Sequence, residues 1–128
     1  MAGEPILIVD DNPGNTKLVS FLLSSRGYAV RTAASAAEAL ALVEEELPRL
    51  VLMDLQMPGM DGYELTRRLK SDARTRGVVI VAVTAYAMKG DEERALGAGC
   101  DGYVTKPIDT RSFTNVVSDM LARGARSP

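Results

Sequence analysis

The chain has 128 residues, of which 46% are hydrophobic and 25% charged, and its formal net charge is −2. These values are typical of one globular domain, and they argue against a nucleic-acid-binding domain, which is usually basic. The sequence contains no histidine and one cysteine, which excludes histidine-based catalysis and an internal disulfide. Cys100 is expected to be a small buried residue in a reducing compartment.

The N-terminal stretch MAGEPILIVDD has no basic residue before its apolar run. It is therefore not expected to be a signal peptide. No segment of the sequence approaches the ~20 apolar residues that a membrane span requires. We expect a cytoplasmic protein without membrane insertion.

Apolar runs and amphipathic stretches alternate five times along the chain. Strands are predicted at residues 5–10, 28–32, 50–53, 78–83 and 102–105. Helices are predicted at residues 13–25, after a cap at Ser35, at 61–70, at 89–96, and from a cap at Asp109 to about Leu121. This alternation indicates an α/β fold, a doubly wound five-stranded parallel sheet of order 2-1-3-4-5, flavodoxin-like, with helices on both faces.

Residue types predict several details of the helices. Asn12 is expected to cap the first helix, with Pro13 at its first position. Ser35 and Glu38 have the spacing of a capping box. The apolar residues of the first helix are expected to face the core: Leu18, Val19, Leu22 and Leu23. The basic residues of the third helix are expected to form a solvated face: Arg67, Arg68 and Lys70.

Polar residues stand at the ends of the predicted strands. Asp10 and Asp11 follow the first strand, Asp54 the third and Thr84 the fourth, and the fifth leads to Lys106. All are at carboxyl ends, where open α/β sheets bind ligands at the reversal of strand order. Since strands one and three are neighbours in this order, we expect the three acids to converge in one pocket. Thr84 and Lys106 are expected on its far side.

Such a cluster of acids predicts a cation site. Two negative charges ~4 Å apart repel by about 4 kcal/mol at a surface dielectric, and Lys106 can offset only part of this repulsion. A hard divalent cation such as Mg²⁺, bound by oxygen, would neutralise the rest. Together with an ammonium and a hydroxyl, these groups are suited to phosphoryl transfer. A carboxylate can itself be the nucleophile, and Asp54 is the best candidate.

Four segments carry a family resemblance: ILIVDDN at 6–12, VLMDLQMPGMDGYE at 51–64, VTA at 83–85 and GYVTKPI at 102–108. Through them the chain resembles the receiver domain of bacterial two-component response regulators over nearly its whole length. The stretch TAYAMKGDEER is similar to single-domain regulators and to receivers of hybrid kinases. The resemblance implies a receiver domain over residues 1–123, followed by a short polar tail at 124–128.

The resemblance also implies a phosphoacceptor site. Asp54 would take a phosphoryl group from a phosphohistidine of a histidine kinase or histidine phosphotransferase. Asp11, Asp54 and the main-chain carbonyl of Gln56 would bind Mg²⁺ directly, whereas Asp10 would act through water. Gln56 and Tyr86 would flank the attacking water and tune the lifetime of the aspartyl phosphate.

Further residues would read the phosphorylation. Lys106 would pair with the phosphoryl oxygens, and Lys106–Pro107 would be a cis peptide. Thr84 would shift its hydroxyl onto the phosphoryl group, and Tyr103 would turn inward beside it. Ala85 is small and would leave the site open to the donor.

The expected output is a contact with a downstream protein, because no DNA-binding or catalytic domain is recognised. We expect no direct nucleic-acid binding, a monomer or a weak phosphorylation-dependent dimer, and no enzymatic activity beyond the protein's own phosphorylation and dephosphorylation. An alternative is a receiver-like binding module that works without phosphorylation. The complete set of acids, Thr84 and Lys106 argues against it.

Two other functions fit less well. Phosphatases that resemble haloacid dehalogenases need a second acid two residues after the nucleophile, and Gln56 stands there. A cap domain would also not fit into 128 residues. A flavin or nucleotide module would need a glycine-rich loop after the first strand, where this chain has DDNPGN.

Overall fold

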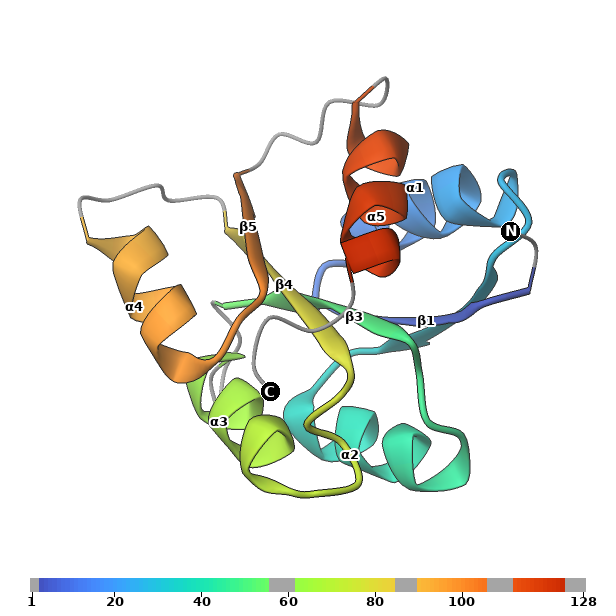
Figure 1. Ribbon diagram of the computed structural model, residues 1–128. Coiled ribbons are helices and arrows are strands. Elements are labelled where there is room, and N and C mark those ends of the chain that lie inside the picture. Colours follow the sequence, from blue (N-terminus) through green and yellow to red (C-terminus); the bar gives the residue numbers. More distant parts are fainter. Residues whose placement is uncertain (1–2, 56–61, 85–89, 106–111, 124–128) are drawn as a thin grey trace.

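The computed structural model describes residues 3–55, 62–84, 90–105 and 112–123, and within these ranges five strands alternate with five helices (Figure 1). The strands are β1 Pro5–Val9, β2 Ala29–Ala33, β3 Leu50–Asp54, β4 Val79–Thr84 and β5 Gly102–Thr105. The helices are α1 Pro13–Ser24, α2 Ala36–Glu45, α3 Gly62–Ser71, α4 Asp91–Ala98 and α5 Phe113–Arg123. All neighbouring strands are parallel, in the order β2-β1-β3-β4-β5, which confirms the predicted fold class.

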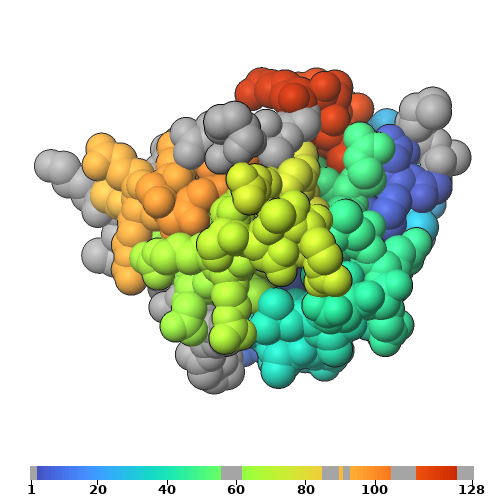
Figure 2. All heavy atoms as spheres, turned by 60° about the horizontal axis from the view of Figure 1, so that its bottom comes forward, coloured from blue at the N-terminus to red at the C-terminus, as the bar shows by residue number. Residues whose placement is uncertain are grey.

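Side chains of the strands alternate between two faces of the sheet. In β3, Leu50 and Leu52 pack with α1 and α5, whereas Val51 and Met53 pack with α2, α3 and α4. β3 and β4 are buried along their whole length, as expected for central strands that are covered on both faces. Figure 2 shows part of the face that α2, α3 and α4 cover, where the orange atoms of α4 lie against the green atoms of α3.

Most of the observed boundaries lie within two residues of the predicted ones, but α5 begins only at Phe113, later than a cap at Asp109 would place it. Residues 61, 89 and 109, where helix starts or caps were predicted, lie outside the described residues, as does the predicted tail at 124–128. Cys100 is fully buried, as expected.

The predicted N-caps of α1 and α2 are both confirmed, whereas the predicted capping box of α2 is only half formed. Asn12 Oδ1 accepts hydrogen bonds from the backbone N–H groups of Gly14 (2.9 Å) and Asn15 (3.2 Å). Ser35 Oγ accepts from the Glu38 N–H at 3.2 Å. Within the described residues, however, the Ser35 N–H does not donate a hydrogen bond to the Glu38 carboxylate. The second hydrogen bond of the capping box is therefore absent.

The prediction for the inner face of α1 is wrong at Leu18, whose side chain is 42% exposed. Val19 and Leu23 are buried, and Leu22 is partly buried against them. At 100° per residue, Leu18 lies about 140° around the helix from Leu23. It therefore falls outside the narrow stripe along which α1 packs on the sheet.

The prediction for the face of α3 is wrong at Lys70. Arg67 and Arg68 are exposed, but the Lys70 side chain is only 8% exposed and its Nζ lies 2.8 Å from Asp101 Oδ2. Lys70 is the penultimate residue of α3, where the chain turns back and brings backbone carbonyls over its ammonium. The contacts that bury this charge come from outside the helix, so helical spacing could not predict them.

Candidate functional site

Three carboxylates converge at the carboxyl edge of the sheet. β1 and β3 are parallel neighbours with Val9 opposite Met53, so Asp10 and Asp54 extend from adjacent strands. One carboxylate oxygen from each of Asp10, Asp11 and Asp54 lies within 4.8 Å of the other two. Asp10 and Asp54 are only 8% and 5% exposed, whereas Asp11 is open to solvent. The predicted convergence of the acids is therefore present.

Main-chain groups of β2 and of the loop after β1 hold Asp10 in place. The Asp10 N–H donates to the Ala33 carbonyl of β2 at 3.0 Å, and Asp10 Oδ1 accepts from the Asn12 N–H at 2.9 Å. Asn12 in turn caps α1. The chain thus passes directly from β1 through the acids into a helix, and the turn that positions Asp10 is the one that starts α1.

Asp54 is held by its place at the end of β3. Its partner in β4 is Val83, and the Leu55 N–H donates to the Val83 carbonyl at 3.2 Å. Thr84 follows Val83 at the end of β4 and is 1% exposed. Thr84 therefore lies at the same edge of the sheet as Asp54, on the side away from β1, as predicted.

Tyr103 lies on β5, one strand further from the acids. It is opposite Ala82 of β4 and packs, partly buried, against the core on the α2, α3 and α4 face. Tyr103 is therefore a half-buried aromatic residue in this structure. Its predicted inward turn on phosphorylation stays a prediction.

Gly62 also shapes the site, although its residue type alone did not predict this role. A Cβ on Gly62 would lie 2.7 Å from the Asp54 carbonyl oxygen and 2.8 Å from Leu55 Cα. The start of α3 therefore packs against the backbone of Asp54 more closely than any side chain allows. The glycine at the start of the predicted third helix was the available signal.

The remaining predicted site residues, Gln56, Ala85, Tyr86, Lys106 and Pro107, lie outside the described residues. Among the described ones, the three carboxylates provide the oxygen ligands that Mg²⁺ prefers, and two of them are held close to the dry core. Clustered carboxylates repel one another, and a divalent cation removes this repulsion. The donor set therefore fits a magnesium ion.

The family model of the response regulator receiver domain matches residues 6–118. The chain therefore belongs to this family and is a receiver of two-component signalling, a class of protein that works with histidine kinases. None of the helices in the described ranges is long and apolar enough to cross a membrane.

Relatives from several organisms agree with this assignment. The chain is 43% identical over 116 residues to the polar-differentiation response regulator DivK of Brucella ovis. The aligned region covers 91% of this chain and 94% of DivK. A CheY-like receiver domain protein from Methanospirillum hungatei is 33% identical, with a TM-score of 0.88 and coverage of 95% and 96% of the two chains.

A third relative bears on the metal. The receiver domain of the sensor histidine kinase PA1611 of Pseudomonas aeruginosa is 35% identical, with a TM-score of 0.86 and coverage of 94% of this chain and 99% of the other. That structure has a magnesium ion coordinated in its active-site cleft.

Proposed function

We propose that Asp54 accepts a phosphoryl group from a phosphohistidine of a histidine kinase or histidine phosphotransferase. The observation that carries this proposal is the position of Asp54, which ends a buried central strand with the carboxylates of Asp10 and Asp11 within 4.8 Å. Asp54 is only 5% exposed beside two other acids, and a divalent cation would offset the repulsion among the three carboxylates.

The transfer is a displacement at phosphorus. An oxygen of the Asp54 carboxylate forms a bond to phosphorus while the bond between phosphorus and the donor's imidazole nitrogen breaks. The imidazole keeps the electron pair of the broken bond, and Asp54 becomes an aspartyl phosphate. An ionised carboxylate needs no base to remove a proton, which agrees with a chain that has no histidine.

Asp11 and Asp54, with the carbonyl of Gln56, would hold Mg²⁺ directly, and Asp10 would hold it through water. When bound, the ion neutralises charge on the acids and on the phosphoryl group. The Asn12 N–H keeps Asp10 oriented for this role by donating to its Oδ1. Gln56 and Tyr86 would tune how long the aspartyl phosphate lasts.

Phosphorylation would change the contacts of Thr84 and Lys106, and Tyr103 would respond by turning inward. The small side chain of Ala85 would leave room for the donor. Moving a population from 1:99 to 99:1 takes about 5.5 kcal/mol of differential stabilisation. One threonine hydrogen bond contributes about 1 kcal/mol, so charge-assisted bonds from Lys106 and contacts with the target protein must contribute the rest. Output would pass to a downstream protein from a monomer or weak dimer.

The protein would catalyse only its own phosphorylation and dephosphorylation. Its phosphoryl groups would come from ATP by way of the donor, which places the proposed reaction in the cytoplasm.

The test is intact-mass analysis after incubation with acetyl phosphate and Mg²⁺. We expect the wild type to gain one phosphoryl group and the Asp54→Asn variant to gain none. Asp119→Asn, the same change at an exposed residue of α5, is the matched control and should be labelled like the wild type. A labelled Asp54→Asn variant would refute Asp54 as acceptor. An unlabelled wild type that still binds Mg²⁺ and accepts nothing from histidine kinases would favour the binding module.

A further inference from the structure

A small cavity of about 20 Å³ lies on the core side of the acid cluster. Asp10 and Asp54 both line it, and so do Asn15 of α1 and Phe113 of α5. The other lining residues are apolar and come from the sheet and from α1: Ile8, Val9, Val19, Leu52 and Val83. The two buried acids of the site therefore share a space that apolar side chains largely enclose.

Asn15 takes a position in α1 that otherwise belongs to the core. It lies four residues before Val19 and eight before Leu23, so at 100° per residue the three fall within about 80° of one another. Val19 and Leu23 are buried, and Val19 lines the same cavity as Asn15. An amide on an apolar face costs free energy unless it is hydrogen-bonded. Packing alone therefore does not explain an asparagine at this position.

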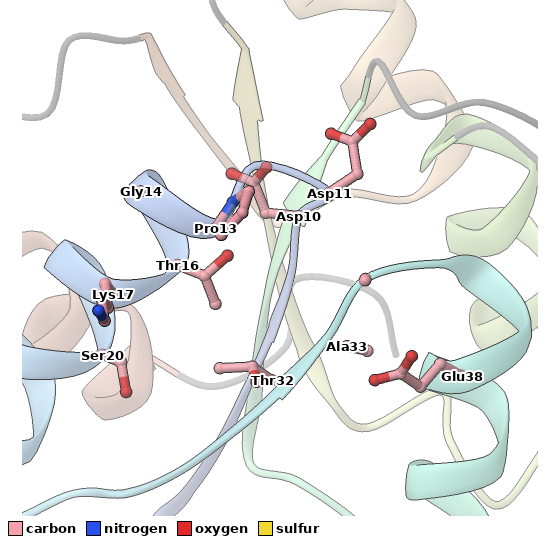
Figure 3. Close-up of a pocket in the computed structure, with 11 residues that line it drawn as sticks. Asp10, Asp11, Pro13, Gly14, Thr16, Lys17, Ser20, Thr32, Ala33 and Glu38 are labelled. Atoms are coloured by element: carbon pink, nitrogen blue, oxygen red, sulfur yellow. The ribbon is translucent and has the colours of Figure 1, made fainter.

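The residues on either side of Asn15 face a different space. Gly14 and Thr16 line an open cleft of about 660 Å³ between α1 and β2, which Asn15 does not line (Figure 3). Asp10 lies at the turn into α1 and lines both the cleft and the small cavity. Asn15 thus faces the core side of the acids rather than the open cleft.

The side chain of Asn15 has hydrogen-bonding capacity left over. Its backbone N–H donates to Asn12 Oδ1 at 3.2 Å, which fixes Asn15 in the first turn of α1. Within the part of the chain that the structure describes, its side-chain amide forms no hydrogen bond. The amide can donate two hydrogen bonds, whereas ionised carboxylates only accept them. Asp10 and Asp54 are therefore the matching partners on this cavity.

The size of the cavity suits one water molecule. A cavity can hold a water if it offers at least about 10–15 Å³ and two to four polar partners. The volume here is about 20 Å³, and three polar side chains line it, those of Asp10, Asn15 and Asp54. A water there would accept a hydrogen bond from the Asn15 amide and donate one to each carboxylate. Its donors and acceptors would then all have suitable partners.

We propose that Asn15 is a positioning residue for phosphoryl transfer, and that it holds the carboxylates of Asp10 and Asp54 from the core side through one buried water molecule. The inference rests on the proposed function, because it requires Asp54 to be the acceptor. Partners behind a metal site orient the groups that bind or react. A hydrogen bond at one oxygen of Asp54 restricts rotation of the carboxylate and keeps the other oxygen directed toward the donor.

The first test compares the rate of labelling with stability. Asn15→Leu keeps the branched shape of the side chain and removes its hydrogen-bonding groups, whereas Asn15→Ser keeps a hydroxyl that can bond to the water. The control is Asn115→Leu, the same change at an exposed residue of α5. Each protein is labelled with acetyl phosphate at saturating Mg²⁺, and its stability is measured by urea unfolding.

We expect Asn15→Leu to be labelled about tenfold more slowly than the wild type, which is the size of effect typical of residues that orient metal-binding groups. Its urea midpoint should not fall, because leucine suits the apolar face of α1 better than an amide does. Asn15→Ser should be labelled at a rate between those of the wild type and Asn15→Leu. Asn115→Leu should be labelled at the wild-type rate.

A crystal structure of the wild type tests the water itself. We expect one ordered water within ~3.2 Å of the Asn15 amide nitrogen and of one oxygen of each of Asp10 and Asp54. A cavity that contains no such water would overturn the proposed contact between Asn15 and the acids.

The labelling experiment can also overturn the inference. Labelling of Asn15→Leu at the wild-type rate would show that Asn15 has no part in the reaction, although Asp54 remains the acceptor. A parallel loss of rate and stability in Asn15→Leu would make Asn15 a structural residue of α1 instead. Failure of the wild type to be labelled by any donor would refute the proposed function itself, and the positioning role with it.

Discussion

The ammonium of Lys70 lies 2.8 Å from the carboxylate of Asp101, and both side chains are buried. The same Nζ donates to the carbonyls of Arg76 (3.1 Å) and Val78 (2.8 Å), so its three donors have three acceptors. Asp101 Oδ2 also accepts from the Ile80 N–H at 2.8 Å, while the Asp101 N–H donates to the Ile80 carbonyl. This pair therefore ties the end of α3 to the start of β4 and the entry to β5.

Replacing Asp101 should be among the most destabilising single changes outside the apolar core. Asp101→Ala leaves the Lys70 charge buried without its counter-ion, and breaking a buried pair in this way costs about 3–5 kcal/mol. Urea unfolding followed by circular dichroism measures the change. Asp119→Ala on the exposed face of α5 is the control, expected within about 0.5 kcal/mol of wild type. A loss below ~1 kcal/mol for Asp101→Ala would mean that solvent reaches the Lys70 ammonium.

Gly62→Ala should disturb the phosphoacceptor strand rather than α3 itself. In a helix, alanine is normally favoured over glycine by up to about 1 kcal/mol. Here the new Cβ would lie 2.7 Å from the Asp54 carbonyl oxygen, a backbone atom that cannot swing aside. Overpacking of this kind costs about 1–3 kcal/mol, so we expect a net loss of stability and slower labelling by acetyl phosphate.

Gly97→Ala in α4 is the matched control, because its Cβ would meet nothing within 4 Å. It should be neutral or stabilising. If Gly62→Ala were as stable as Gly97→Ala, the close approach of α3 to Asp54 would be wrong.

The sequence could predict those features that depend on local patterns. The apolar strands, the Asn12 cap and the order of elements follow from periodicity and capping chemistry, and the convergence of the acids follows from parallel strands that end at one edge. Lys70 and Gly62 could not be predicted in this way. The partner of Lys70, Asp101, is 31 residues away in the sequence. The contact of Gly62 with Asp54 and Leu55 depends on how α3 packs back on β3, so the glycine alone could mark the position but not the contact.

The exposed apolar residues of α1 could not be predicted from local patterns either. Phe21 is 70% exposed on α1, although its residue type favours the core. Helical spacing indicates which residues share a face, but the width of the buried stripe depends on how the helix packs on the sheet. Only the fold shows that this stripe is centred on Val19 and Leu23.

Asp11→Ala should weaken magnesium binding without unfolding the protein. Asp11 is exposed and supplies one of the three clustered carboxylates, so its removal takes away a charge and a ligand at little cost in packing. At a surface dielectric one charge pair ~4 Å apart is worth about 4 kcal/mol, and solvent screening at this open site reduces that figure. We expect Mg²⁺ affinity to fall at least about tenfold by calorimetry. Unchanged affinity in Asp11→Ala would remove Asp11 from the metal site.

Asp11→Asn is the matched variant for this experiment, because it keeps an oxygen ligand and removes only the charge. An affinity between those of the wild type and Asp11→Ala would separate the ligand's contribution from that of its charge.

Thr84→Ala should separate acceptance of the phosphoryl group from its readout. Thr84 is buried at the end of β4, next to β5, and its hydroxyl is proposed to move onto the phosphoryl group while Asp54 alone forms the covalent bond. We therefore expect Thr84→Ala to be labelled by acetyl phosphate but to lose most of the change that labelling causes in β5. The measurement is NMR of backbone amides at Gly102–Thr105 before and after labelling, with Thr84→Ser as the variant that keeps the hydroxyl. The hydroxyl would not be the relay if the β5 shifts in Thr84→Ala matched those of Thr84→Ser at equal labelling.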